Sequence, residues 1–261
     1  MQRDSTLGTI LTATILCVVC SVIVSASAVG LKSIQDGNKK RFRQSNILEA
    51  AGFTDEDIAE KGVDTLFESI ETRLINLETG EDAEGKDIEK FDQKKAAKDP
   101  TLTDSMEIPK DKQTFGFKQH ERFGRVYLMK EGGTLKKVIL PIYGKGLWST
   151  LYGFIALEAD LNTVAGITYY EHKETPGLGG EVENAKWKAQ WCGKLVCNAD
   201  DELKLEVIKG QVGDGSEGVS HQIDGLSGAT ITSRGVSNSV RYWLNDGYRP
   251  FLEKLAGGNN G

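Results

Sequence analysis

Apolar and polar residues are unevenly distributed along the chain, and one long apolar run lies close to the N-terminus. From Leu7 to Leu31 no charged residue occurs over 25 positions, and a helix of that length spans a bilayer. Ala26-Ser27-Ala28 has the small-x-small form of a signal-peptide cleavage site. The apolar run is longer than a usual signal core, so we interpret 7–31 as a retained transmembrane anchor that follows a stub at 1–6.

The segment 32–115 is polar and rich in charge, and we interpret it as membrane-proximal. Thr54-Asp55-Glu56-Asp57 has the form of a capping box, and apolar residues at helical spacing follow over 63–70. The alternation over 73–78 predicts a strand, although its leucines also fit a helical period. From about 80 to 103 nearly every residue is charged or small, which is compatible with a linker, a solvated helix or an insertion.

Strand patterns dominate the remaining segment, 116–261. Two hairpins are predicted, with turns at 131–134 and 160–162. A helix is predicted at 183–191. Strands are expected at 125–130, 136–143, 151–157, 164–172 and 205–209. The pattern is that of an α+β fold, with one transmembrane helix followed by a mixed antiparallel-sheet and helix domain. It lacks the βαβ alternation of a Rossmann domain.

Composition narrows the functional classes. The chain has 261 residues and a net charge of −6, and it shows no basic patch with interleaved aromatics, which argues against binding of nucleic acid. The four cysteines are too few for a disulfide framework. Cys192 and Cys197 match no metal-binding spacing, and we expect two buried thiols unless an oxidising compartment pairs them.

A short motif of small residues lies near the C-terminus and reads Asp224-Gly225-Leu226-Ser227-Gly228-Ala229-Thr230. The pattern Asp-x-x-Ser-Gly-Ala-Thr resembles the attachment signal of covalent-flavin proteins, in which the threonine oxygen is esterified to the phosphate of FMN. The alternative is a plain loop before a helix. A threonine hydroxyl is a poor nucleophile at neutral pH, so a transferase has to close around it.

The residues of this motif would allow a transferase to reach the threonine hydroxyl. Ser227, Gly228 and Ala229 have little side-chain bulk, which leaves the backbone accessible to a second protein. Asp224 is placed to orient the loop or the incoming donor. Apolar residues at helical spacing over 236–244 predict a helix that begins near residue 232 or 233. Thr230 would then lie just ahead of a helix N-terminus, which favours a phosphate.

Two other predicted turns contain glycines together with aromatic or charged residues. Residues 143–149 read Tyr-Gly-Lys-Gly-Leu-Trp-Ser, and residues 174–180 read Glu-Thr-Pro-Gly-Leu-Gly-Gly. Both are compatible with ordinary tight turns, and neither is a phosphate loop of the nucleotide-binding kind. A flavin needs a flat apolar wall together with backbone donors and acceptors for its pyrimidine edge. We predict a cofactor-binding pocket formed by Trp148, Glu174, Thr175, Gly177 and Leu178.

The run from Ile167 to Val182 reads Ile-Thr-Tyr-Tyr-Glu-His-Lys-Glu-Thr-Pro-Gly-Leu-Gly-Gly-Glu-Val. With Gly-Lys-Gly-Leu-Trp-Ser before it and Ser-Gly-Ala-Thr after it, this run resembles the C-subunit family of the bacterial sodium-translocating NADH:quinone reductase. The resemblance covers most of the chain and is weakest from about residue 80 to 115. Its specificity comes from three motifs in the same order.

The resemblance implies a single-pass protein of the bacterial inner membrane whose soluble domain is periplasmic and carries FMN on Thr230 through a phosphoester. It also implies maturation by a flavin transferase that uses FAD and magnesium. The partners would be the other subunits of a membrane complex that oxidises NADH, reduces ubiquinone and exports sodium. The flavin itself would be the reactive group, with no further catalytic residue and no metal ligand on this chain.

The distribution of basic residues on the two sides of the apolar run favours the opposite topology. Five lysines and arginines follow the apolar run over 32–43, whereas only Arg3 precedes it, so the positive-inside rule favours a cytoplasmic domain. The rule is weak for long exported domains, and we follow the resemblance, which leaves the stub 1–6 in the cytoplasm. Two alternatives are the flavin-carrying G subunit of the Rnf ion-pumping complex and a non-redox, membrane-anchored export or interaction module.

Overall fold

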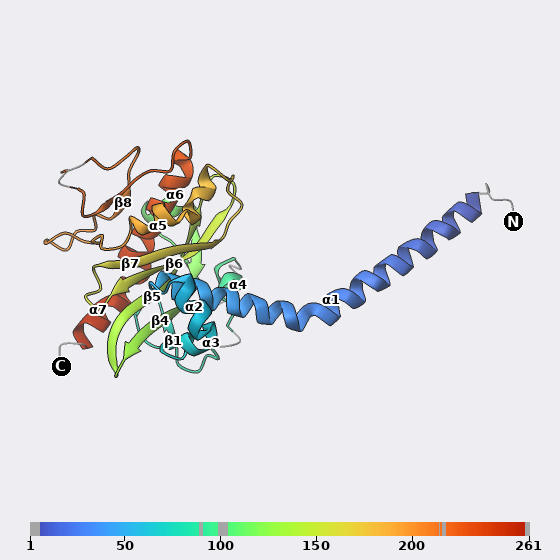
Figure 1. Cartoon of the computed structure of the whole chain (residues 1–261), viewed down its shortest axis with the longest axis horizontal. Helices are drawn as coiled ribbons and strands as arrows, with labels where there is room; N and C mark the ends of the chain where they lie inside the picture. Colours follow the sequence, from blue (N-terminus) through green and yellow to red (C-terminus); the bar gives the residue numbers. More distant parts are fainter. Residues whose placement is uncertain (1–5, 89–90, 99–103, 214, 216–217, 259–261) are drawn as a thin grey trace. The chain divides into compact units, whose positions relative to one another are not determined.

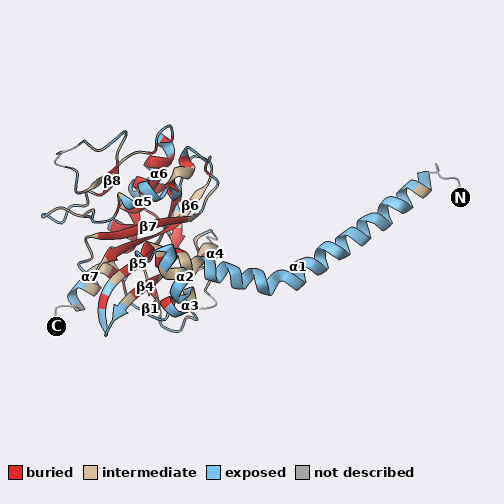
Figure 2. Cartoon of the chain, in the orientation of Figure 1, coloured by how far each residue is buried: buried red, intermediate tan, exposed pale blue. Residues whose placement is uncertain are grey.

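The computed structural model describes residues 6–88, 91–98, 104–213, 215 and 218–258. The chain divides into two units, residues 1–43 and 44–261. The first unit consists of helix α1 (Thr6–Ala50) up to the boundary, and Figure 2 shows that almost all of this part is exposed. The helix is long and apolar enough to cross a membrane. It contains the predicted span 7–31 and continues without a break to Ala50.

The end of α1 belongs to the globular unit, where Ile47 and Leu48 are buried. Helix α2 (Asp55–Lys61) begins with the predicted capping box. The amide of Asp57 donates to Thr54 Oγ1 at 3.1 Å, and the amide of Thr54 donates to Asp57 Oδ2 at 2.9 Å. Helix α3 (Val63–Phe67) follows and is shorter than predicted, because the residues from 70 onward enter a strand.

A five-stranded antiparallel sheet forms the centre of the unit, in the order β1-β4-β5-β6-β7. Its strands are β1 (Ile70–Asn76), β4 (Phe123–Glu131), β5 (Thr134–Lys145), β6 (Thr150–Glu158) and β7 (Val164–Glu171). The two predicted hairpins are confirmed as β4–β5 and β6–β7. The alternating segment at 73–78 is confirmed as a strand over 73–76, where it pairs with β4, whereas residues 77 and 78 lie in the following turn. Residues before 115 therefore contribute to the same sheet as those after it.

Both faces of the sheet are covered. On β5, Val138 and Leu140 enter one apolar cluster while Ile139 enters the other, as the twofold repeat of a strand requires. The cluster around Ile139 also contains the end of α1 and residues of α3. The cluster around Val138 is larger and contains residues of the C-terminal helices, such as Val236 and Trp243.

The C-terminal helices are α6 (Thr230–Tyr242), a π-helical segment (Trp243–Gly247) and α7 (Arg249–Gly258). Helix α6 packs directly on β5 (Figure 1). A Cβ on Gly144 would lie 2.4 Å from Ser239 Cβ, and one on Gly235 would lie 2.0 Å from the carbonyl oxygen of Lys145. Only glycine permits this approach, so the backbones of the helix and the strand are in contact.

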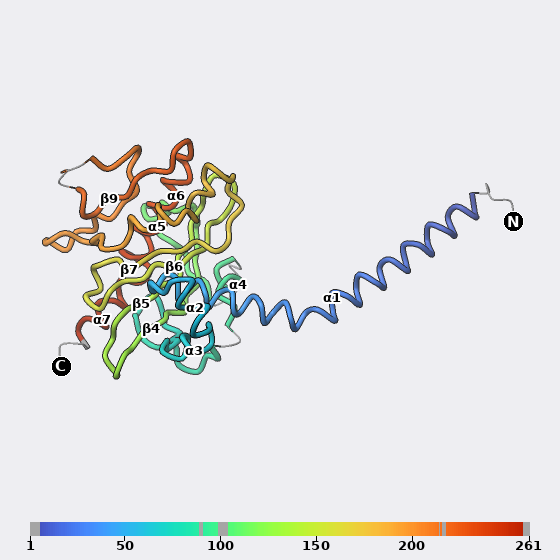
Figure 3. Tube along the Cα trace, viewed as in Figure 1, coloured from blue at the N-terminus to red at the C-terminus, as the bar shows by residue number. Residues whose placement is uncertain are grey.

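The smaller elements surround this core. They are β2 (Ser105–Glu107) with β3 (Gln119–Glu121), β8 (Glu206–Val207) with β9 (Gln222–Ile223), α4 (Gln93–Lys98), α5 (Ala185–Ala189) and two 3-10 turns at Lys110–Phe115 and Gly179–Glu183. The predicted helix at 183–191 is thus divided between a 3-10 turn and α5, and the strand predicted at 205–209 is reduced to β8. In the charged segment 80–103, residues 89–90 and 99–103 lie outside the described residues. Figure 3 traces the chain from β9 to the start of α6.

Candidate functional site

The Ser-Gly-Ala-Thr loop runs directly into α6. The helix begins at Thr230, with Ala229 as its N-cap, so it starts earlier than the residues 232 or 233 that we predicted. The cause is Ser233, whose amide and hydroxyl both donate to the carbonyl of Ala229, at 2.9 and 3.1 Å. Thr230 is exposed and occupies the first helical turn. Gly228 has φ +70°, which a residue with a side chain adopts only with strain.

Asp224 fixes the beginning of this loop. Its Oδ1 accepts the amide of Val212 at 2.7 Å, and its carbonyl accepts the indole N–H of Trp187 at 2.8 Å. Its own amide donates to Gln190 Oε1 at 3.0 Å. The carboxylate thus joins the loop to the segment at Val212, and the backbone of Asp224 joins it to Trp187 and Gln190.

Glu174 joins the other two turns to α6. Its buried carboxylate accepts the amides of residues 147, 148 and 149 at 3.2, 2.9 and 3.1 Å. It also accepts the hydroxyl of Thr232 at 2.7 Å. In addition, the amide of Lys173 donates to Ser149 Oγ at 2.7 Å. The two turns therefore meet the first turn of α6, directly after the Ser-Gly-Ala-Thr loop, around one carboxylate.

The ionisation of Glu174 follows from these contacts. Burial raises the pKa of a carboxyl group, because the charged form loses its hydration. The hydrogen bonds from Thr232 and from the amides of 147–149 act in the opposite direction and prevail, so the pKa of Glu174 lies below its ordinary value. The group is thus a carboxylate at neutral pH and serves as an acceptor for the surrounding donors.

The other predicted pocket residues lie at the surface. Trp148 is 70% exposed and Leu178 is 43% exposed, and Thr175 and Gly177 are also exposed. A Cβ on Gly228 would lie 2.9 Å from Leu178 Cδ2, so Leu178 rests against the Ser-Gly-Ala-Thr loop. The side chain of Glu174, by contrast, points inward and supports the turns.

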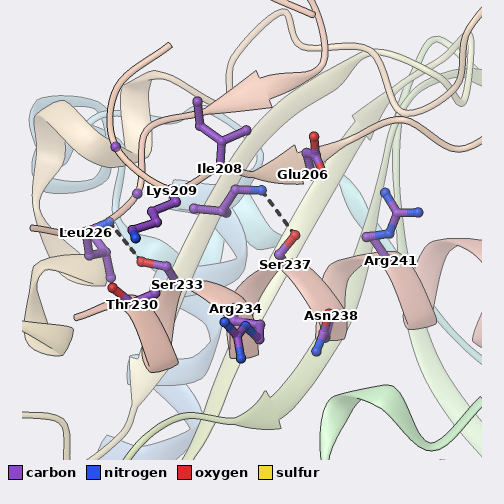
Figure 4. A pocket seen from close by; sticks show the side chains of 13 residues that line it. Glu206, Ile208, Lys209, Leu226, Thr230, Ser233, Arg234, Ser237, Asn238 and Arg241 are labelled. Atoms are coloured by element: carbon purple, nitrogen blue, oxygen red, sulfur yellow. Dashed lines mark hydrogen bonds between the residues drawn. The ribbon is translucent and has the colours of Figure 1, made fainter.

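A cavity of about 290 Å³ lies beside α6, and Thr230 is at its edge (Figure 4). Strand β8 and α6 form its walls. The amide of Val207 donates to Ser237 Oγ at 3.2 Å, and the amide of Leu226 donates to Ser233 Oγ at 2.9 Å. The lining includes three basic side chains, those of Lys209, Arg234 and Arg241.

Our sequence interpretation did not include this cavity. A partial signal was present, because Arg234 and Arg241 are four and eleven residues after Thr230 and share its helical face. The hydrogen bond from Thr232 to Glu174 was not predicted either. Cys192 and Cys197 are free thiols, but neither is buried as expected: Cys192 is exposed and Cys197 is partly exposed. Among the described residues, no group of His, Cys, Asp and Glu side chains is arranged to hold a metal ion.

These residues fit a flavin that is bound through its phosphate. Thr230 offers an exposed hydroxyl on the first turn of a helix of 13 residues, and the side chain of Ala229 provides no acceptor to cap the first amides. Leu178 exposes apolar surface beside the same loop, and Trp148 exposes apolar surface on the turn that Glu174 connects to α6. Basic side chains line the adjacent cavity. The site thus provides a nucleophilic oxygen, donors for an anion and an apolar surface for a ring.

Comparison with known families agrees with this chemistry. A family model described as an FMN-binding domain matches residues 146–245, a range that begins within the turn at 143–149 and contains the other two motifs. The fold and this match define a protein with an FMN-binding domain.

Similar relatives include the C subunit of the Na⁺-translocating NADH-quinone reductase of Pseudomonas aeruginosa, 45% identical over 259 residues that cover 98% of each chain. The protein of the same name from Pasteurella multocida is 44% identical over 265 residues, which cover 100% of this chain and 99% of the other. The crystal structure of Shewanella oneidensis NqrC aligns with a TM-score of 0.74 and 34% identity, covering 84% of this chain and 99% of that chain. The chain belongs to the C-subunit family of the Na⁺-translocating NADH-quinone reductase.

This family membership decides among the alternatives that the sequence left open. It favours the quinone reductase over the flavin-carrying G subunit of the Rnf complex, because the relatives match over nearly the whole chain. The match to an FMN-binding domain likewise goes against a non-redox export or interaction module.

Proposed function

We propose that this chain carries FMN esterified through its phosphate to Oγ1 of Thr230 and relays electrons within a sodium-translocating NADH:ubiquinone reductase. The proposal is carried by the position of Thr230, an exposed hydroxyl on the first turn of α6 inside a matched FMN-binding domain. Relatives are named as the C subunit of an NADH-quinone reductase, so other subunits of the complex would bind NADH and quinone.

When bound, FMN supplies reversible electron transfer. The protein's contribution is to hold the attachment point and the ring surface in a fixed relation. Glu174 does this by binding the loop that carries Trp148 and the helix that carries Thr230 at the same time. Trp148 and Leu178 would exclude water from one face of the ring, and the exposed turn at Thr175 and Gly177 would present backbone groups to its polar edge.

Attachment requires a donor that already contains an activated phosphate. With FAD as donor, Oγ1 of Thr230 forms a bond to the phosphorus on the flavin side while the phosphoanhydride bond breaks. AMP leaves, and the hydroxyl proton passes to a base on the transferase, so the step involves no change of oxidation state. A flavin transferase would supply this base and the magnesium ion. The small residues Ser227, Gly228 and Ala229 leave room for that enzyme to reach the hydroxyl.

We also propose that residues 44–261 lie on the periplasmic side of the inner membrane and that α1 is the single anchor. Two observations support this topology: the long apolar helix, and family membership that extends over 98% of the chain. The basic residues at 32–43 favour a cytoplasmic placement instead, so the topology requires a test of its own.

The attachment is tested by intact-mass measurement of the full-length protein, produced with and without a flavin transferase. We expect an added mass of FMN less one water only when the transferase is present, and peptide mapping should place it on Thr230. Thr230→Ala and Thr230→Val, the latter nearly isosteric, should lose the adduct and the in-gel fluorescence, whereas Thr230→Ser should retain part of it. The hydroxyls of Thr232 and Ser233 are engaged inside the protein. An adduct on either of them, or none on the wild-type protein, would overturn the proposal.

A further inference from the structure

The cavity beside Thr230 contains basic side chains that have no ion-pair partner among the residues that the structure describes. These are Lys209, Arg234 and Arg241. Many other basic residues of the unit are paired, for example Lys112 with Asp246 and Arg249 with Asp201. One carboxylate, that of Glu206, also lines the cavity, and its Oε1 accepts a hydrogen bond from Gln222 at 3.1 Å. The cavity therefore has a net positive charge in a chain whose total charge is −6.

Two of the three cations are placed to reach a group on Thr230. Arg234 is one helical turn after Thr230, about 6 Å along the axis, and helical side chains tilt toward the N-terminus. Lys209 comes from the segment after β8, and Figure 4 shows its amino end directed toward the start of α6 near Thr230 and Ser233. Arg241 lies eleven residues on, about 16 Å along the axis.

The positions of these cations are fixed by the walls that carry them. The amide of Gly225 donates to the carbonyl of Gly210 at 2.8 Å, directly after Lys209. The amide of Val207 donates to Ser237 on α6 at 3.2 Å, so β8 is held against the helix. A phosphate on Thr230 would therefore meet Lys209 from one wall and Arg234 from the other.

We propose that Lys209 and Arg234 are the binding residues for the phosphate at Thr230. This inference rests on the proposed function and names the residues of the chain that act on the anion. Before the transfer they attract the diphosphate of FAD to the hydroxyl and stabilise the negative charge on the phosphoryl oxygens as the bond to Oγ1 forms. Afterwards they neutralise the single charge of the phosphodiester. Arg241 is too far along the helix to take part.

The test uses full-length protein in detergent with purified flavin transferase, FAD and magnesium, and follows the adduct by intact mass over time. The variants are Lys209→Gln, Arg234→Gln and the matched control Arg241→Gln, which removes the same charge from the same cavity. We expect the initial rate to fall about tenfold or more for the first two, because a charge-assisted hydrogen bond is lost, and to be unchanged for the control. Lys209→Arg should restore most of the rate. High salt should reduce the difference between wild type and the two variants.

A second measurement does not depend on transferase activity. The ³¹P resonance of loaded, full-length protein should shift in Lys209→Gln and Arg234→Gln and stay in place in Arg241→Gln. Each variant should melt at the temperature of the wild type, since none of the three cations has an ion-pair partner to lose among the described residues. The inference would be overturned if all variants formed the adduct at the wild-type rate with an unchanged ³¹P resonance. It would also be overturned if Arg241→Gln lost as much of the rate as Lys209→Gln and Arg234→Gln. Neither result would contradict the attachment itself. Failure of the proposed function would appear instead as wild-type protein without an adduct.

Discussion

The hydroxyl of Thr232 donates a 2.7 Å hydrogen bond to Oε2 of Glu174, and both side chains are buried. The same carboxylate accepts three backbone amides from the turn that carries Trp148. A single ionised group therefore connects the start of α6 with the apolar surface expected to face the flavin. Because Thr230 and Thr232 are in the same helical turn, we expect a change at Glu174 to affect Thr230, the proposed attachment residue.

The first prediction concerns this connection. Glu174→Gln loses the charge and one acceptor oxygen, and we expect the free energy of unfolding to fall by about 3 kcal/mol, while Thr232→Val should lower it by about 1 kcal/mol. Chemical denaturation measures both. The neighbouring exposed side chain of Lys173 provides a control, and Lys173→Ala should stay within about 0.5 kcal/mol of wild type.

The pH dependence of the same pair provides an independent check. The folded pKa of Glu174 lies below the unfolded value of 4.5, so its contribution is complete above that pH and is lost as the pH falls through the folded pKa. The difference in stability between wild type and Glu174→Gln should therefore narrow below about pH 4.5. A difference that stays constant into the acid range would show that the charge has no role.

The second prediction concerns Glu121, whose buried carboxyl accepts Tyr143 Oη at 2.7 Å and Gln93 Nε2 at 2.6 Å. Burial raises its pKa, these hydrogen bonds lower it, and the result is a pKa of about 7 against an ordinary 4.5. The folded state thus binds the proton more tightly, and stability should fall as the pH rises from 4.5 to 7. The loss amounts to about 3 kcal/mol at 1.36 kcal/mol per pKa unit.

Glu121→Gln should remove this slope, because the side chain then stays neutral throughout. Thermal or chemical denaturation between pH 4.5 and 7.5 measures it as the change of stability with pH. Glu107→Gln on the paired strand β2, where the side chain is exposed, serves as the control and should keep the wild-type slope. An equal slope in Glu121→Gln and wild type would disprove the assignment.

The third prediction concerns Trp148. Because its side chain is 70% exposed, Trp148→Ala should change the free energy of unfolding by no more than about 0.5 kcal/mol. Loss of the indole ring that is expected to cover the flavin should nevertheless shift the absorption spectrum or the midpoint potential of the flavin. The covalent adduct should be retained. Val219→Ala, at an exposed apolar residue of another loop, should leave the spectrum and the potential unchanged. An unaltered flavin in Trp148→Ala would remove this residue from the pocket.

The fourth prediction concerns topology. Alkaline phosphatase fused after Gly261 should be active, because the enzyme folds only after export and the domain is proposed to be periplasmic. The same enzyme fused at the N-terminus should be inactive. Activity at the N-terminus and inactivity after Gly261 would establish the cytoplasmic placement that the basic residues at 32–43 favour.

Much of the fold could be predicted from local patterns. The strands of both hairpins are short, largely apolar runs separated by turn residues, and the capping box at Thr54 depends on residues only three positions apart. The pairing of β1 with β4 could not be predicted, because it joins segments about fifty residues apart through backbone groups. Long-range contacts of this kind leave no periodic signal in a single sequence.

The site was predictable to a similar extent. Thr230 and Trp148 have exposed side chains and belong to short motifs that can be recognised in the sequence. The role of Glu174 was not predictable in the same way, because its four donors come from a preceding strand connection and from a following helix. Lys209 joins the cavity only through the position of β8 beside α6.

The contact between Gly144 on β5 and the residues of α6 has a consequence for electron transfer. With backbone against backbone, there is no intervening layer of side chains whose repacking would let the helix slide or tilt. The helix that begins at Thr230 is therefore held closely against the sheet. A redox group attached at Thr230 would not move independently of the sheet. Any movement of the attachment point between donor and acceptor would require movement of the whole globular unit or of its partners. Tunnelling distances in the complex would then be set mainly by how the subunits dock.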